Sequence, residues 1–460
     1  MPKPAKSWAW CCRNGRDTRA HENSFIAWQG KRRICMSLKT YGAIALTLVL
    51  AIAISYVCTP FVIRLANRIG WMDIPKDKRR MHKKAIPLLG GLSIIAGFLF
   101  SSLIILLVLG HFSDYYPPRI LLLMLQILPG AAIIAVVAFF DDRFNLPPLP
   151  RLAVQCVAAG IAVAMGVRIQ FISGSVRLFG TQTFNLGWLS IPVTIIWIAG
   201  MTNAMNWIDG LDGLAAGISS IASGTVLILA TLQGRPQLAV AILTAALAGG
   251  CLGLLPYNKN PAKVFMGDTG AMFLGYTLGV ISVQGLFKFY AAISFLVPIL
   301  ILALPILDTA SAILRRLAEG KSPFTPDRSH IHHKLIDMGL SQKQAVGFLY
   351  AVSGTLSVIA ILFTVFGKVI GWRFLLLTLL VVLGASLVAL KLCRKYNAQC
   401  KCKNESILHG CAAGKEPEKQ PPEPDGQKSP AVDEKSTNTP ARPDTPDAAE
   451  PNKKDKQGGE

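Results

Sequence analysis

Residues 42 to 63 of the chain read GAIALTLVLAIAISYVCTPFVI, a stretch without a single charged side chain. An apolar run of about 20 residues is long enough to cross the hydrocarbon core of a bilayer as a helix. Similar runs recur as far as Leu390. Only 16% of the residues are charged, against roughly a quarter in soluble proteins. The sequence therefore predicts a polytopic membrane protein with an all-α fold.

We expect about eleven transmembrane helices joined by loops, since each run has the length that a bilayer requires. The expected spans are residues 41–66, 88–109, 119–140, 150–166, 187–206, 211–231, 236–256, 269–286, 289–314, 346–367 and 371–391. The fourth span is short. Pro192, Pro298 and Pro305 predict kinks in the fifth and ninth spans, which neighbouring helices can accommodate.

Composition divides the chain into four regions. Residues 1–40 form a basic N-terminal extension, within which Met36 is an alternative candidate for the natural start. The transmembrane domain covers residues 41–390, and a juxtamembrane segment with several cysteines covers residues 391–414. Residues 415–460 are rich in proline and charged residues, so we expect this tail to be disordered. Neither the extension nor the tail is assigned a catalytic role.

Loop charge predicts the orientation of the protein in the membrane. The loops after the odd-numbered spans contain more lysine and arginine than the others, so we expect them to face the cytoplasm. The N-terminus then lies outside and the C-terminal tail inside. The net charge of +21 is spread over these loops, and the absence of a clustered basic domain argues against nucleic-acid binding.

Acidic residues of the transmembrane domain gather at the predicted cytoplasmic side, with Asp114 as the exception. A carboxylate at membrane depth costs about 2.5–3.5 kcal/mol unless it is paired or hydrated, so this clustering suggests a shared task. Carboxylate oxygens suit Mg²⁺, with Mn²⁺ as a substitute.

Four motifs carry the candidate chemistry. Asp141 and Asp142 end the third span, and Asp268 opens the eighth span within Phe-Met-Gly-Asp-Thr-Gly. Each of these two motifs is equally compatible with a structural role, as a polar stop at the membrane surface or as a helix N-cap. The other two motifs are a polar helix end, comprising Asn203, Asn206, Asp209 and Asp212, and a basic loop, comprising Arg328, His330, His332 and His333.

The polar helix end repeats at intervals of three residues, which places its members on one face of a helix. Its alternative reading is a tight polar turn. The basic loop suits phosphate binding or proton transfer, with a zinc site or a solvated loop as alternatives. Lys83 lies in a basic segment that is also explained by topology or by anionic lipid. Asp308, inside the ninth span, is expected to be structural rather than catalytic.

In this order, the motifs resemble the polyprenyl-phosphate N-acetylhexosamine-1-phosphate transferases, glycosyltransferase family 4, over roughly residues 41–390. The His-Ile-His-His form of residues 330–333 is similar to the branch that starts O-antigen, enterobacterial common antigen and wall teichoic acid synthesis. It is less similar to the peptidoglycan branch, which transfers phospho-N-acetylmuramoyl-pentapeptide and stays the alternative.

The resemblance implies a UDP-N-acetylhexosamine donor, usually UDP-N-acetylglucosamine, and undecaprenyl phosphate as the acceptor, with UMP released. It implies a bacterial inner-membrane enzyme whose active site faces the cytoplasm, and it allows a homodimer. By motif position, Asp268 matches the principal Mg²⁺ ligand, while Asp141 and Asp142 match the assisting acidic pair, Asp141 also as a general base. The implied substrate-binding residues are Lys83, Asn203, Asn206, Asp209, Asp212, Arg328, His330, His332 and His333.

A rival class is an ion-coupled transporter or flippase. Such a protein would carry ionisable groups near the midpoints of its helices and toward both membrane faces. In this sequence the acids gather at one predicted face, and only Asp308 comes close to the middle of a span. We therefore expect an enzyme.

Overall fold

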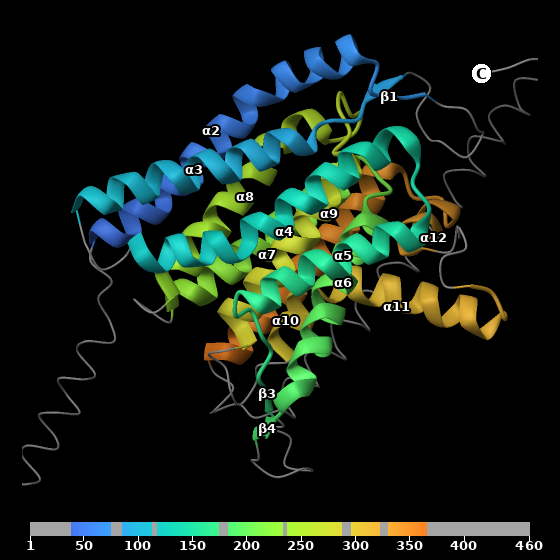
Figure 1. The fold of residues 1–460 in the computed structure, drawn as a ribbon. Coiled ribbons are helices and arrows are strands. Elements are labelled where there is room, and N and C mark those ends of the chain that lie inside the picture. The colour runs from blue at the N-terminus through green and yellow to red at the C-terminus, as the bar shows by residue number, and fades with distance from the viewer. Residues whose placement is uncertain are drawn as a thin grey trace, which may run out of the picture. The chain divides into compact units, whose positions relative to one another are not determined.

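The computed structural model describes residues 38–74, 85–112, 117–173, 183–232, 237–287, 296–322 and 330–365. These residues form a bundle of helices (Figure 1). Eight of the described helices are long and apolar enough to cross a membrane, which confirms an all-α, multi-pass membrane protein. The predicted last span, most of the N-terminal extension, the juxtamembrane segment and the tail lie outside the described residues.

The helices are α2 (Leu38–Ile69), α3 (Gly91–Phe112), α4 (Pro117–Phe144), α5 (Pro148–Ala164), α6 (Ser190–Ile208), α7 (Leu214–Leu232), α8 (Leu238–Asn258), α9 (Gly267–Ser282), α10 (Leu296–Ile301), α11 (Ala303–Ala318) and α12 (Ile331–Asp337), followed by a helix over Gln342–Val365. A 3-10 turn, η1 (Gly187–Leu189), leads into α6, and a π-helical turn, η3 (Val283–Phe287), continues α9.

Two antiparallel hairpins were not predicted. One pairs β1 (Met72–Asp73) with β2 (Ile86–Pro87), and the other pairs β3 (Phe171–Ser173) with β4 (Thr183–Asn185). Strands of two or three residues are too short to show the apolar–polar alternation that reveals a strand in a sequence. The first hairpin connects α2 to α3 beside the candidate site.

The predicted fourth and ninth spans differ most from expectation. The fourth corresponds to α5, an apolar helix of 17 residues, which is shorter than the eight candidate spans. The ninth is divided at Leu302 into α10 and α11, between Pro298 and Pro305. Proline lacks the backbone N–H that continues a helix, so the expected kink is a break. In Figure 1, α11 lies at the edge of the bundle, where it packs against α6.

Helix α9 is the central element of the bundle. Its apolar stretch, continued into η3, is fully buried, whereas only 22% of the corresponding stretch of α2 is buried. Its most extensive packing is against α6 and α4. A helix that is apolar on every side and enclosed by others has a fixed position, so its first turn is a rigid support for a functional group.

Glycines hold the start of α9 against the start of α3. Gly91 donates its backbone N–H to the carbonyl oxygen of Met266 at 2.8 Å. A Cβ on Gly91 would lie 2.3 Å from the backbone of Gly270, closer than any real side chain permits. Small residues at such crossings let two helix backbones approach. This contact fixes the turn that carries Asp268.

Candidate active site

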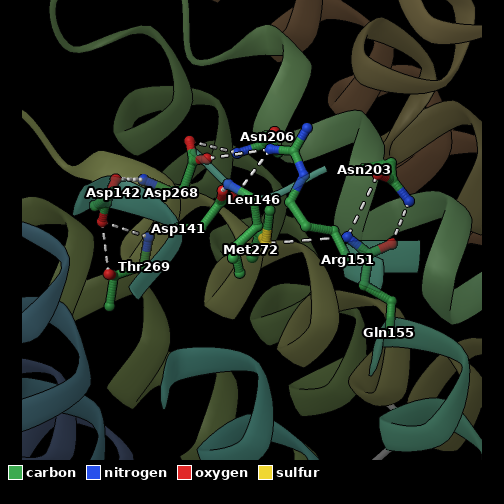
Figure 2. A network of polar contacts seen from close by, with 10 residues as sticks. All are labelled: Asp141, Asp142, Leu146, Arg151, Gln155, Asn203, Asn206, Asp268, Thr269 and Met272. Carbon is green, nitrogen blue, oxygen red and sulfur yellow. Dashed lines mark hydrogen bonds and ion pairs between the residues drawn. The ribbon is translucent and has the colours of Figure 1, made fainter. Parts of the chain in front are cut away.

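Three segments that are distant in the sequence meet at one end of the bundle. The last turn of α4 carries Asp141 and Asp142, the last turn of α6 carries Asn206, and the first turn of α9 carries Asp268 (Figure 2). Hydrogen bonds join these segments directly. The structure therefore brings together the acidic residues that the sequence predicted to share a task.

Asp142 caps helix α9 from outside it. Its carboxylate accepts the backbone N–H groups of Asp268 (2.7 Å) and Thr269 (3.1 Å), and the Thr269 hydroxyl (2.7 Å). The first amides of a helix have no partner within it, and Met266 at the N-cap supplies none. The charge of Asp142 also faces the positive end of the helix dipole. Both carboxylate oxygens are thus engaged, which favours an architectural role over the expected metal-ligand role.

Asp141 is bound by an arginine that the sequence analysis did not single out. Its Oδ2 atom lies 2.8 Å from Nη1 of Arg151, and its Oδ1 atom accepts the backbone N–H of Leu146 at 2.7 Å. The same Nη1 atom lies 3.5 Å from Oδ2 of Asp268. Arg151 therefore bridges two acids. A single arginine near the start of a predicted span is explained by membrane topology alone, so the sequence offered no reason to select Arg151 as a site residue.

The two asparagines of α6 lie on one helix face, as predicted, but have different partners. Asn206 donates through Nδ2 to Oδ1 of Asp268 at 2.8 Å. Asn203 exchanges side-chain hydrogen bonds with Gln155 of α5. Asn206 therefore orients the central acid, whereas Asn203 ties α6 to α5.

A cavity of about 720 Å³ opens beside Asp268. Its charged and amide-bearing lining residues are Asp73, Asp142, Asp209, Asp212, Asn258, Asn260, Lys263, Asp268, His333 and Gln342. A second cavity of about 410 Å³ is lined by Asp141 and Arg143. Asp142 and Asp268 line both cavities, so they form a shared wall between two spaces.

Asp209 follows the last residue of α6 and lines the larger cavity. Burial, followed by the charges of Asp268 and Asp212, raises the pKa of its carboxyl to about 7. Neighbouring carboxylates that oppose one another's ionisation mark a place where a cation is electrostatically favoured. The larger cavity therefore has an acidic wall suited to a divalent ion.

Asp212 supports the loop that follows α8. Its Oδ2 atom accepts Nδ2 of Asn260 at 2.8 Å and the backbone N–H of Ala262 at 3.1 Å. Asn260 also donates to Oε1 of Gln342, in the last described helix, at 2.6 Å. The predicted substrate contact of Asp212 is thus accompanied by a structural one.

The three histidines of the basic loop face different surroundings. Nδ1 of His330 lies 2.8 Å from Oδ2 of Asp308. His332 is buried against Gly210, where a Cβ would lie 2.3 Å from its Nε2 atom. Burial lowers the pKa of His332 to about 4, so its ring is neutral at pH 7 and supplies no positive charge. Of the three, only His333 lines the larger cavity.

The remaining predicted residues, Lys83 and Arg328, lie outside the described residues. The structure adds Asn258, which the sequence analysis did not single out. Its Nδ2 atom donates to the carbonyl oxygen of Val264 at 2.9 Å, while its buried Oδ1 atom has no partner among the described residues. Asn258 is one of the residues that line the larger cavity.

The carboxylates of the larger cavity fit a magnesium ion that is held partly by substrate and water, rather than a metal ion held entirely by protein side chains. Within the described residues, no three His, Cys, Asp or Glu side chains gather around a common point. Mg²⁺ usually takes one or two carboxylates and completes its shell with water and substrate phosphates. Asp268 and Asp209 share a cavity and repel each other electrostatically, as such a pair would in the absence of the ion.

In metal-free buffer, we expect the contribution of Asp209 to the melting temperature to fall as the pH rises from about 4 to about 7. The pKa of Asp209 is raised from 3.8 to about 7, so in this window the folded state keeps a proton that the unfolded chain has lost. Removing that proton disfavours the folded state. The melting temperature of the wild type relative to Asp209→Asn should therefore fall over this window in detergent-solubilised protein, measured by differential scanning fluorimetry. Asp337→Asn, at an exposed acid of α12, should show the same change of melting temperature with pH as the wild type. Equal slopes of melting temperature against pH in the wild type and in Asp209→Asn would contradict the raised pKa of Asp209.

Comparisons with known proteins agree with this geometry. The profile of glycosyl transferase family 4 matches residues 124–286, from α4 to η3. A protein of Bacillus subtilis (strain 168), named "Probable undecaprenyl-phosphate N-acetylglucosaminyl 1-phosphate transferase", is 39% identical over 309 residues, which are 66% of this chain and 80% of that protein.

Two further relatives come from other bacteria. The decaprenyl-phosphate N-acetylglucosaminephosphotransferase of Mycolicibacterium smegmatis is 32% identical over 71% of this chain and 84% of its own length. The undecaprenyl-phosphate alpha-N-acetylglucosaminyl 1-phosphate transferase of Escherichia coli (strain K12) is 31% identical over 70% of this chain and 84% of its own length. These matches extend well beyond the segment that contains the acidic cluster.

Proposed function

Since this chain belongs to glycosyl transferase family 4, we propose that it transfers N-acetylglucosamine-1-phosphate from UDP-N-acetylglucosamine to undecaprenyl phosphate. The products are UMP and a lipid-linked sugar diphosphate that starts a cell-envelope polysaccharide. The names of the Bacillus and Escherichia relatives support both the sugar and the acceptor. The observation that carries the proposal is the cavity that joins Asp268, Asp209 and His333 at the ends of membrane helices.

The reaction requires positioning and charge neutralisation more than covalent chemistry. An oxygen of the acceptor phosphate attacks the β-phosphorus of the donor and forms a new P–O bond. The bond from that phosphorus to the oxygen bridging to the α-phosphate breaks, and UMP leaves with the electron pair. His333, in the cavity wall, binds the donor phosphates. A phosphate dianion is nucleophilic without a base, which relieves Asp141 of that role and leaves it to hold Arg151.

Asp268, with Asp209 across the same cavity, would hold Mg²⁺. The ion supplies neutralisation of the diphosphate and stabilisation of the leaving UMP. Nη1 of Arg151 lies 3.5 Å from Oδ2 of Asp268, and its positive charge partly compensates the negative charge of this carboxylate when the anionic donor binds. Asn206 keeps the carboxylate of Asp268 in one orientation through its 2.8 Å hydrogen bond.

We further propose that this site faces the cytoplasm at the bacterial inner membrane. The donor is a soluble cytosolic nucleotide sugar, whereas the acceptor head group is tethered at the bilayer surface. A reaction centre at helix ends serves both. The distribution of lysine and arginine among the loops supports this orientation.

The peptidoglycan-type reaction, transfer of phospho-N-acetylmuramoyl-pentapeptide, is the second candidate from the sequence. The names of the relatives at 31–39% identity favour N-acetylglucosamine instead. A transporter or flippase is disfavoured because the acids around Asp268 gather at one end of the bundle.

The test is release of UMP by the purified full chain. Undecaprenyl phosphate and MgCl₂ are supplied with UDP-N-acetylglucosamine, UDP-N-acetylgalactosamine or UDP-N-acetylmuramoyl-pentapeptide in parallel. We expect UMP from UDP-N-acetylglucosamine only when the acceptor is present, and loss of release with EDTA that added Mg²⁺ restores. Release from the pentapeptide donor alone would overturn the sugar assignment, and release without the acceptor would overturn the transferase assignment.

A further inference from the structure

Asp308 is a buried carboxylate that the reaction described above does not use. It lies in α11 and is 2% exposed. Its Oδ2 atom lies 2.8 Å from Nδ1 of His330, and its Oδ1 atom accepts the backbone N–H of Ile331 at 2.7 Å. Both partners belong to the start of α12. One acid of α11 therefore holds the beginning of the helix that carries His332 and His333.

Helix α12 depends on such anchors because it has only seven residues. Isolated helices shorter than about 12–15 residues are marginal in water, so tertiary contacts must define a helix of this length. His330 occupies the N-cap position but makes no side-chain capping bond. Asp308 supplies the missing acceptor from α11, and its charge faces the positive end of the helix dipole.

A second contact ties the same region to α6. The guanidinium of Arg316, on α11, lies 4.9 Å from the ring centre of Trp207, and the ring of His330 lies 6.1 Å from that of Trp207 in an edge-to-face arrangement. Trp207 is the neighbour of Asn206, which binds Asp268. The start of α12 is thus located relative to the acidic cluster through α11 and α6 together.

The orientation of α12 decides what its histidines contact. His332 fits against Gly210, where no Cβ has room, and His333 lines the larger cavity. Both residues belong to the same short helix, with ring centres 4.3 Å apart, so a rotation of α12 moves the two rings together. An anchor at the start of the helix therefore sets the position of a side chain in the cavity wall.

We propose that Asp308 is a positioning residue that, through His330 and the start of α12, places His333 at the donor phosphates. This inference rests on the proposed function. Misplacement of a binding group by about 1 Å can cost up to about 100-fold in rate. Asparagine at position 308 keeps an oxygen that can accept the Ile331 N–H, but it removes the carboxylate charge, and its amide group can bond Nδ1 of His330 only as a donor, which requires the other ring tautomer.

The experiment measures UMP release by Asp308→Asn, His333→Ala and the double variant. Asp308→Asn should lower kcat/KM for UDP-N-acetylglucosamine by about 10- to 100-fold, chiefly through KM, while KM for undecaprenyl phosphate stays unchanged. In the His333→Ala background the same change should cost less than about 2-fold, because the effect passes through His333. Equal losses in both backgrounds would overturn the proposal. Asp337→Asn, at an exposed acid of α12, is the matched control and should retain activity.

A second measurement separates this inference from the proposed function. Hydrogen–deuterium exchange over residues 330–340 should be faster in Asp308→Asn than in the wild type or in Asp337→Asn, with or without activity. Unchanged exchange in Asp308→Asn would overturn the anchoring role. If exchange is faster in Asp308→Asn but the wild type releases no UMP, only the transferase assignment is overturned. Should Asp308→Asn fail to fold, His330→Gln tests the same link, with the same dependence on His333 expected.

Discussion

Replacing Asp268 by asparagine is expected to abolish sugar-phosphate transfer, lowering kcat by about 10³-fold or more. The amide keeps the size of the carboxylate, and its oxygen still accepts the hydrogen bond from Asn206. What disappears is the charge that would hold a divalent cation beside the donor diphosphate. The fold should survive, because removing one of several mutually repelling carboxylates relieves electrostatic strain. UMP release and the melting temperature, measured on the same preparation, check both statements.

The control for this variant is Asp337→Asn, which removes a carboxylate from an exposed position on α12. It should leave UMP release and the dependence on Mg²⁺ as in the wild type. If Asp268→Asn kept activity within about tenfold of the wild type, Asp268 would not be the metal ligand, because loss of one such electrostatic group usually costs about 10²–10³.

Replacing Asp142 by alanine is expected to lower stability and activity together. The change removes three hydrogen bonds from the first turn of α9 and leaves the amides of Asp268 and Thr269 without their partner. At about 1 kcal/mol for each bond, the free energy of unfolding should fall by about 3 kcal/mol. Activity falls because the turn that presents Asp268 loses its anchor. Unfolding in detergent, followed by tryptophan fluorescence, measures the change.

Thr269→Val is a milder test of the same contact, because it removes only the hydrogen bond from the Thr269 hydroxyl to Asp142. We expect a loss of about 1 kcal/mol, since valine has nearly the shape of threonine. A fully stable Asp142→Ala protein without activity would reverse the assignment and make Asp142 a chemical group. The pair of variants therefore separates the two acids: Asp268 for chemistry and Asp142 for architecture.

Much of the fold could be predicted because the bilayer imposes simple rules. Uncharged runs such as residues 42–63 give the positions of the helices directly. The acidic cluster was predictable for a related reason: carboxylates near membrane depth are costly, so Asp141, Asp209 and Asp268 required a common explanation. The structure brings these residues together at one end of the bundle.

The individual partners could not be predicted, because they depend on how helices distant in sequence pack. Asp141 and Asp142 are adjacent in the chain, yet one binds Arg151 and the other caps α9. Nothing in a pair of neighbouring aspartates distinguishes these roles. Likewise, His332 and His333 are neighbours, but only His333 lines the cavity, because helical geometry turns adjacent side chains about 100° apart.

The complete burial of α9 has a consequence for the exchange of substrate and product. Backbone amides of a fully packed helix become accessible only when much of the protein opens, whereas short peripheral elements open at a small free-energy cost. Asp268 stands on the first kind of element, and His333 stands on the second, a helix of seven residues. Local opening that lets a product leave is therefore expected at α12, beside His333, rather than at the first turn of α9, which carries Asp268.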